Sequence, residues 1–172
     1  PINGTVYVVD GDNRIQIFDG SVGVQTIRLT FEGNAINGRA VTVDSDGRIL
    51  YVNRNLGYIF SIDPGSGVVS ALGGPGTGNA QFKDPSDVAT DSAGNIFIAD
   101  RGNHRVQVLR ANGDFVTAFG REGSGAGQFR NPIGIDVDAP GNVYVTDLSN
   151  NRVQKSGRPL RGVIEHSSGE PA

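Results

Sequence analysis

The sequence predicts an all-β protein, a β-propeller built from four-stranded antiparallel blades, and two periodic features carry this prediction. A short apolar run that starts at a glycine and ends at an Asp or Asn occurs over residues 4–10, 47–53, 94–100 and 141–147. The ends of successive copies are 43, 47 and 47 residues apart, and Asp44, Asp91 and Asp138 keep the same spacing of 47. Repeats of about 40–50 residues are typical of four-stranded propeller blades.

Residues 84–120 show how one repeat divides into four strands. A run over 86–91 ends at a glycine turn, and the next run, 95–100, is apolar on both faces, as a strand between stacked blades must be. An alternating run over 105–109 is followed by an Asn-Gly turn and a last apolar run over 115–119. No stretch has the i, i+3, i+4 pattern of a long amphipathic helix.

The same division along the chain gives about 3.7 repeats. We expect a partial blade over 4–31 that begins at its second strand, and further blades over 38–73, 84–120 and 131–165. Residues 162–164 are the candidate for a frayed last strand, and residues 166–172 are expected to form a disordered tail. Because the chain begins in mid-repeat and contains no Met, we expect it to be a processed or excised piece of a longer protein.

Composition excludes several classes of function. The net charge of −3 and the pI of about 5.3 disfavour a general nucleic-acid surface and an anionic-membrane surface. No apolar run is long enough to span a membrane. The chain has no Cys, which excludes disulfides, thiolate metal ligands and thiol nucleophiles.

Two of the repeats share a longer motif. It consists of Gln128-Phe129 followed by Pro132, the run 141–147 and Asn-Asn-Arg-Val-Gln at 150–154, and it has a counterpart from Gln81-Phe82 to Val108. Both units resemble the NHL repeat, and the resemblance is closer in the unit that starts at Gln81. It covers residues 81–154, extends to 4–19 and is looser over 38–63. It implies a ring of six blades, of which this chain would form a part or an open, assembled arc. NHL propellers serve protein binding, RNA binding, sensing and enzymatic roles, so the resemblance fixes no activity.

An Asp that ends the second strand and an Arg near the start of the third recur together. The three pairs are Asp10 with Arg14, Asp100 with Arg105, and Asp147 with Arg152. In the second repeat Asn53 and Tyr58 stand at these positions, so both charges are missing together. Removing one partner of a buried ion pair costs about 3–5 kcal/mol, which makes joint loss the expected pattern for a structural pair. We therefore interpret these residues as braces rather than as a repeated binding site.

The sequence predicts no catalytic residue, metal site or cofactor. Asp44, Asp91 and Asp138 precede glycine-containing turns and lack the later ligands of a calcium loop, so we interpret them as turn residues. His104 and His166 are the only histidines, too few for a three-histidine zinc site. The glycine-rich segments 73–76 and 123–127 lack the Gly-Lys-Ser/Thr ending of a phosphate loop.

Binding is expected on the edge of the blades that carries the longer and more varied loops. Strands alternate in direction, which places the connections between second and third strands and those between blades on one edge. The candidate residues there are Arg54, Asn55, Arg101, His104, Arg121, Glu122, Leu148 and Asn150.

Three hypotheses of function follow. We favour a non-catalytic binding or assembly module that presents this edge to a protein or carbohydrate partner, in an extracellular or periplasmic location. The first alternative is a propeller enzyme of the lyase or lactonase type, for which the innermost strands offer only Thr42, Asp87 and Asp136. The second is an RNA-binding propeller, which the acidic balance and the lack of Trp disfavour.

An open arc would expose an apolar blade face at each end. We expect Val6, Val8, Ile15 and Ile17 at one end and Val143, Val145 and Val153 at the other. Contiguous apolar surface marks an interface, and two different end faces lead to head-to-tail association. The chain is therefore expected to self-associate, or to pair with its missing blades.

Overall fold

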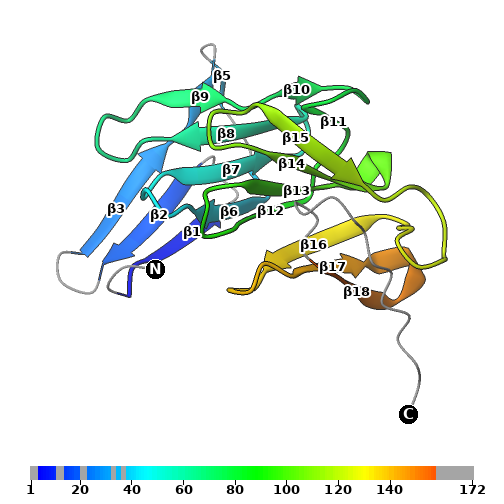
Figure 1. The fold of residues 1–172 in the computed structure, drawn as a ribbon. Coiled ribbons are helices and arrows are strands. Elements are labelled where there is room, and N and C mark those ends of the chain that lie inside the picture. The colour runs from blue at the N-terminus through cyan, green and yellow to red at the C-terminus, as the bar shows by residue number, and fades with distance from the viewer. Residues whose placement is uncertain (1–3, 11–13, 20–22, 32–33, 36–37, 158–172) are drawn as a thin grey trace.

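The computed structural model describes residues 4–10, 14–19, 23–31, 34–35 and 38–157, and in this part the chain is all-β (Figure 1). The predicted fold class is confirmed: antiparallel sheets of three or four strands follow one another as propeller blades. In the described residues no helix combines the length and hydropathy of a membrane span. The expected strand at 162–164 and the tail 166–172 lie outside the described residues.

Among the described residues, two blades have four strands and two have three. Blade 1 comprises β1 (Val6–Asp10), β2 (Arg14–Asp19) and β3 (Gly23–Arg28). Blade 2 comprises β6 (Ala40–Val43), β7 (Ile49–Asn53), β8 (Tyr58–Ile62) and β9 (Val69–Ala71). Blade 3 comprises β12 (Asp87–Thr90), β13 (Ile96–Asp100), β14 (Arg105–Leu109) and β15 (Phe115–Phe119). Blade 4 comprises β16 (Pro132–Val137), β17 (Val143–Asp147) and β18 (Arg152–Ser156).

Short elements join the blades. The antiparallel pair β4 (Thr30–Phe31) and β5 (Asn34–Ala35) follows blade 1, and the parallel pair β10 (Gly74–Pro75) and β11 (Gln81–Phe82) lies between blades 2 and 3. Two 3₁₀ turns, η1 (Arg101–Asn103) and η2 (Leu148–Asn150), connect the second and third strands of blades 3 and 4. These short pairs were not predicted, because two-residue strands leave no periodic signal.

The innermost strands β6, β12 and β16 lie side by side. β7 packs against β12 and β13 against β16, each the second strand of its blade against the first strand of the next. β1 packs against β6 in the same way. β1, the first described strand of blade 1, is therefore equivalent to the second strand of the later blades.

Three apolar layers fill the space between successive blades, and strand alternation assigns the side chains to them. Between blades 1 and 2 lie Ile15, Ile17, Ile49, Tyr51, Phe60 and Ile62. Between blades 2 and 3 lie Leu50, Val52, Ile59, Val88, Ile96 and Ile98. Between blades 3 and 4 lie Phe97, Val106, Val108, Ile135, Val143 and Val145. β7 and β13 are buried along their whole length because they contribute to two layers each.

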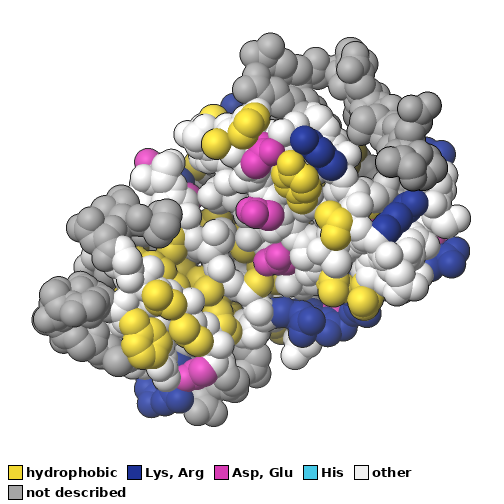
Figure 2. Space-filling model, turned by 90° about the horizontal axis from the view of Figure 1, so that it is seen from below, with side chains coloured by type: hydrophobic (Ala, Val, Ile, Leu, Met, Phe, Trp, Pro, Cys, Tyr) yellow, Lys and Arg dark blue, Asp and Glu magenta, His cyan; other side chains and the backbone are white. Residues whose placement is uncertain are grey.

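The expected composition of the two end faces is wrong in part. Ile15 and Ile17 pair in register with Val9 and Tyr7 and face blade 2, where they are buried. The outer face of blade 1 instead carries Val6, Val8 and Phe18, all exposed. In Figure 2, hydrophobic side chains gather on the left, the side on which Figure 1 places β1–β3.

At the other end Val143 and Val145 are buried against blade 3, and only Val153 of the expected set is exposed. Its neighbours on the outer face of blade 4 are polar: Lys155 lies over the Tyr144 ring, with its Nζ 5.5 Å from the centroid. Alternation shows that a strand has two faces but does not show on which side the neighbouring blade lies.

Each of the connections after blades 2 and 3 is anchored by an aromatic ring, Phe82 or Phe129, both buried. The rings pack over Gly73 and Gly120, whose φ angles are +93° and +92°. A Cβ at these glycines would lie 2.7 Å from the Phe82 ring and 2.5 Å from the Phe129 ring. Glycine is therefore required at both positions by the close approach and by the left-handed backbone.

Candidate functional site

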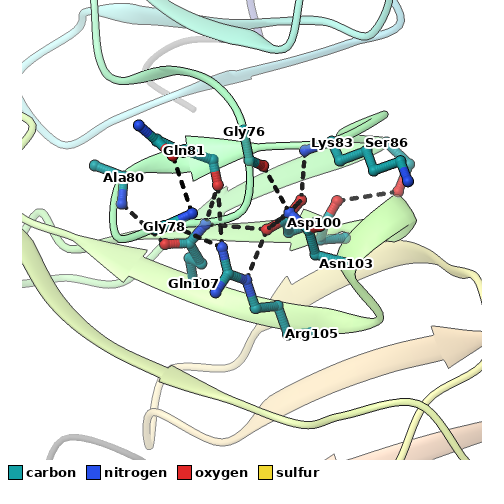
Figure 3. Close-up of polar contacts among 11 residues, drawn as sticks. Gly76, Gly78, Ala80, Gln81, Lys83, Ser86, Asp100, Asn103, Arg105 and Gln107 are labelled. Atoms are coloured by element: carbon teal, nitrogen blue, oxygen red, sulfur yellow. Dashed lines mark hydrogen bonds and ion pairs between the residues drawn. The ribbon is translucent and has the colours of Figure 1, made fainter.

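The Asp100 carboxylate is the centre of a hydrogen-bond network on one edge of blade 3 (Figure 3). Asp100 is fully buried at the end of β13. Its oxygens accept from the Lys83 N–H at 2.9 Å, the Asn103 amide at 2.9 and 3.0 Å, Arg105 Nε at 2.8 Å and Gln107 Nε2 at 3.0 Å. The buried charge is thus fully hydrogen-bonded, as burial of a carboxylate requires.

The same donors hold the connection between blades 2 and 3. Asn103 Nδ2 donates to the Gly76 carbonyl at 3.0 Å, and Arg105 Nη2 donates to the Gly78 carbonyl at 2.7 Å. Gln107 is fully buried; its Nε2 donates to the Gln81 carbonyl at 2.6 Å, and its Oε1 accepts the Ala80 N–H at 3.0 Å. A single set of side chains therefore ties a segment of irregular backbone to a rigid sheet. We call it the clamp of blade 3.

Blade 4 repeats the clamp with every residue 47 positions later. Asp147 accepts from the Arg130 N–H at 2.6 Å, Asn150 at 2.8 Å, Arg152 at 3.0 Å and Gln154 at 3.3 Å. Asn150, Arg152 and Gln154 in turn donate to backbone carbonyls between Gly123 and Gln128. Burial raises the pKa of Asp147, but the hydrogen bonds from Arg130, Asn150 and Arg152 outweigh it and lower the pKa below its ordinary value.

Among the described residues, blades 1 and 2 have fewer hydrogen bonds at the positions of the clamp. In blade 1 the Arg14 Nε and Gln16 Nε2 donate to Asp10 Oδ2 at 2.8 and 2.9 Å. In blade 2 Asn53 Oδ1 accepts the Leu56 N–H at 2.9 Å, and Tyr58 stacks on Phe60 with ring centroids 5.6 Å apart. The structure thus brings together each of the three predicted Asp–Arg pairs. Their contribution to stability stays a prediction.

The clamps contain residues that sequence reasoning missed. Gln107 lies in the alternating run 105–109 and Gln154 in the NHL-like run 150–154, and neither run by itself predicts a buried amide that holds a connection. Asn150 was a binding candidate, yet its amide is occupied by Asp147 and Gly123. The 47-residue spacing could have identified them. The Asn and Gln of the clamp recur at this spacing together with the Asp, the Arg and the Gln-Phe of the connection.

The clamps lie on the edge where we expected binding, which we call the loop face: residues 54–57, 73–86, 101–104, 120–131 and 148–151. Arg54 and Arg101, from the connections that follow β7 and β13, both bind the carboxylate of Asp84. The hydrogen bond that Arg54 donates to the Asp84 carboxylate raises the pKa of Arg54. Nδ1 of His104, which has φ of +55°, accepts the Asn131 N–H at 3.2 Å. These three candidates therefore join neighbouring blades.

The remaining candidates point to solvent. Asn55, Arg121, Glu122 and Leu148 are exposed, and the backbone of Glu122 forms a parallel bridge with Phe129. A groove of about 210 Å³ lies beside Asn55, between blades 2 and 3. Its lining includes Arg54, Leu56, Thr77 and Lys83.

The aspartates in the first turn of blades 2, 3 and 4 accept hydrogen bonds from the backbone of their own turns. Asp44 Oδ1 accepts the N–H groups of Asp46 and Arg48 at 3.0 and 2.9 Å, and Asp91 Oδ1 accepts those of Ala93 and Asn95. The hydrogen bond from the Asn142 side chain, together with those of the Asn142 N–H and Tyr144, lowers the pKa of Asp138. Among the described residues no three His, Cys, Asp or Glu side chains are grouped as around a metal ion.

The innermost strands place Asp87 and Asp136 near one another, and among the described residues no third His, Cys, Asp or Glu side chain is grouped with them as around a metal ion. Asp87 accepts its neighbour's N–H (Val88) and, across the blade boundary, the Ile135 N–H, both at 2.9 Å. Burial raises the pKa of Asp87, and the nearby Asp136 adds to that rise, while the hydrogen bonds and Arg39 oppose it. The carboxylate thus braces β12 against β16.

Comparison with known families identifies the repeat. Residues 82–109 and 129–155 match the NHL repeat. Each match starts at the buried Phe of a connection and ends within the third strand of the following blade, so it contains the side chains of the clamp but not the backbone groups that precede the Phe. The chain contains NHL repeats.

Solved structures share the propeller architecture of these NHL repeats. An auxiliary nutrient binding protein from Bacteroides thetaiotaomicron has a TM-score of 0.71 and 20% identity, over 90% of this chain and 45% of that protein. A virginiamycin B lyase from Staphylococcus aureus has a TM-score of 0.67 and 16% identity, over 92% and 53%. A chain of a nidogen–laminin complex has a TM-score of 0.68 and 17% identity, over 91% and 56%.

At these identities the likeness shows the fold alone. The chain spans about half the length of these structures. No curated protein matches its sequence.

Proposed function

We propose that this NHL propeller segment is a non-catalytic binding and assembly module that presents its loop face to a partner protein. The clamps of blades 3 and 4 are the observation that carries the proposal. They fix the connections 76–83 and 123–130 on rigid sheets through buried carboxylates. The backbone from which side chains project on such connections is held in place before binding, which lowers the entropy lost on association.

The loop face has side chains left for a partner after the clamps are formed. Lys83, Arg121 and Arg130 are exposed, as is Leu148. None of their side chains has a hydrogen bond or ion pair within the described residues. Exposed residues on loops that a scaffold positions are a common source of binding specificity.

A non-catalytic role is favoured by the use of the polar residues. The carboxylates of Asp100 and Asp147 are saturated by donors, and Asp87 braces two innermost strands. The lyase among the similar structures shares only the fold, and a fold does not fix an activity.

Assembly would use the outer face of blade 1. Val6, Val8 and Phe18 form an exposed apolar group there, because Phe18 pairs in register with Val6. The outer face of blade 4 is different and more polar, so association of two copies through these ends would be head-to-tail.

Photo-crosslinking tests which edge meets a partner. A benzophenone amino acid is placed at Arg121 on the loop face and, as a matched control, at Asn112, which is exposed on the opposite edge. In extract of the source cells, the probe at 121 should give one discrete adduct that excess unlabelled protein removes, and the probe at 112 should not. Equal adducts from both positions, or an adduct only from 112, would contradict the proposal.

A further inference from the structure

The two edges of the propeller segment carry opposite charge. The loop face has five basic residues (Arg54, Lys83, Arg101, Arg121, Arg130) and two acidic ones (Asp84, Glu122), a net charge of +3. The opposite edge, formed by the turns at 44–48, 63–68, 91–95, 110–114 and 138–142, has six aspartates and two arginines, a net charge of −4. In Figure 2, most Lys and Arg side chains in view lie on the right, where Figure 1 places η1 and η2.

Three of the cations on the loop face are free to bind. Asp84 takes up Arg54 and Arg101, whereas Lys83, Arg121 and Arg130 are exposed and unpaired within the described residues. Lys83 and Arg130 occupy equivalent places 47 residues apart, directly after Phe82 and Phe129. Their backbone N–H groups donate to Asp100 and Asp147, so the clamp fixes the point from which each cation projects.

Apolar side chains are interspersed with these cations. Leu56 and Leu148 are 45% and 47% exposed on the same face, which is high for leucine. Leu56 and Lys83 line the groove between blades 2 and 3 together. A ligand that suits this surface combines carboxylates with apolar residues.

We propose that the loop face binds an acidic protein segment, whose carboxylates pair with Lys83, Arg121 and Arg130 and whose apolar side chains contact Leu56 and Leu148. This inference rests on the proposed function and names the chemistry of its partner. Complementary charge on an interface steers association and makes it dependent on salt.

Nucleic acid fits the loop face less well. Single-strand binding uses aromatic side chains on which bases stack. The two Phe residues of the described loop face, Phe82 and Phe129, are both buried, and no exposed Tyr lies on it. The cations are therefore not accompanied by a stacking platform.

The first measurement uses a fluorescein-labelled peptide in which the unit Glu-Glu-Leu is repeated eight times. Its binding is measured by fluorescence anisotropy. We expect saturable binding to the whole 172-residue chain that weakens at least tenfold between 50 and 300 mM NaCl, on the order expected for a few exposed ion pairs. A peptide with serine in place of leucine should bind more weakly. A lysine–leucine peptide should not bind to this face.

Variants locate the site. Lys83→Glu with Arg121→Glu and Arg130→Glu should weaken peptide binding at least tenfold, since attraction becomes like-charge repulsion. The matched control Arg110→Glu, an exposed cation on the opposite edge, should change it less than twofold. Single Gln substitutions at the same three positions, each expected to bind about two- to fivefold more weakly, keep the test valid if the triple variant does not fold.

Three outcomes would overturn the inference. One is equal weakening in Arg110→Glu and in the triple variant, and another is no peptide binding at low salt. The third is an oligouridylate of equal charge that binds more tightly through the same cations. If the peptide fails while the crosslink from position 121 persists, the partner chemistry is wrong and the proposed function stands; if both fail, both are wrong.

Discussion

Arg105 and Asp100 face each other in register at the point where β13 passes into β14, with Nε 2.8 Å from Oδ2. The carboxylate is fully buried, and the guanidinium also donates to the carbonyls of Gly78 and Gln81. One side chain thus neutralises a buried charge and joins blade 3 to the connection that comes from blade 2. The pair therefore connects blade 3 to the segment that precedes it and also links β13 to β14 within the blade.

Loss of this joint should be costly. Arg105→Ala leaves the Asp100 charge without its cation and removes the guanidinium donor to the Gly78 and Gln81 carbonyls, so we expect the free energy of unfolding to fall by about 2–4 kcal/mol. Arg121→Ala removes an exposed, unpaired cation and should cost under about 0.5 kcal/mol. Urea denaturation of both variants measures the difference. Equal losses would show that the Asp100–Arg105 pair is not structural.

Gln107 offers a neutral test of the same clamp. Gln107→Leu keeps the side-chain volume roughly constant but leaves the Ala80 N–H without its acceptor and the Gln81 carbonyl with Arg105 as its remaining side-chain donor, at about 1–3 kcal/mol. Amide exchange at Ala80 should accelerate. The Gly127 N–H, held by Gln154 at 3.0 Å in the next blade, is the internal control and should keep its rate. Unchanged exchange at Ala80 would mean that the connection is fixed by other contacts.

The clamp also shows what the sequence could and could not predict. Strands such as β13 and β17 were predictable because an apolar run stands between a glycine turn and an Asp at a fixed period. The role of Gln107 was not, because a polar residue in an alternating strand is ordinarily expected to face solvent. It is buried because the incoming connection covers it, and that contact joins residues 26 and 27 positions apart.

The candidate binding residues divide in the same way. Topology placed Arg54, Arg101 and Arg121 correctly on one edge, since alternating strand direction fixes which loops share it. It could not tell which of them are free. Arg54 and Arg101 converge on Asp84, whose place beside both depends on how the connection folds back over the blades. Arg121 has no such neighbour among the described residues.

The lowered pKa of Asp147 predicts a loss of stability in acid. A carboxylate whose folded pKa lies below the unfolded value of about 3.9 contributes stability above that value and loses it as pH falls through the folded pKa. Asp147→Asn lacks this contribution. The gap in unfolding free energy between wild type and Asp147→Asn should therefore narrow from pH 6 to pH 2, as followed by urea titrations. A gap independent of pH would contradict the shift.

Asp87 should show the opposite sign. Burial raises its pKa, so the stability it contributes is full below the unfolded pKa and declines as pH rises through the folded pKa. The free energy of unfolding of Asp87→Asn should therefore rise relative to that of wild type between pH 3 and pH 6, whichever of the two is more stable at pH 3. If Asp87→Asn lost ground over this range, the carboxylate would be stabilised by its hydrogen bonds rather than destabilised by burial.

Self-association through blade 1 is the remaining expectation. Val6, Val8 and Phe18 are 54%, 40% and 39% exposed on one side of the β1–β2 pair, whereas Ile15 and Ile17 on the other side are buried. An apolar group on a sheet face is a site of association because its burial removes hydrocarbon from water.

We expect light scattering of the purified chain to give a mass above 18.0 kDa. Phe18→Asp, which places a charge opposite Val6 in this group, should shift the mass toward the monomer. Val68→Asp changes a residue that is 58% exposed in the turn after β8 and should leave the mass unchanged. A wild-type monomer of 18 kDa with a cooperative melt would show that the exposed face of blade 1 does not mediate assembly.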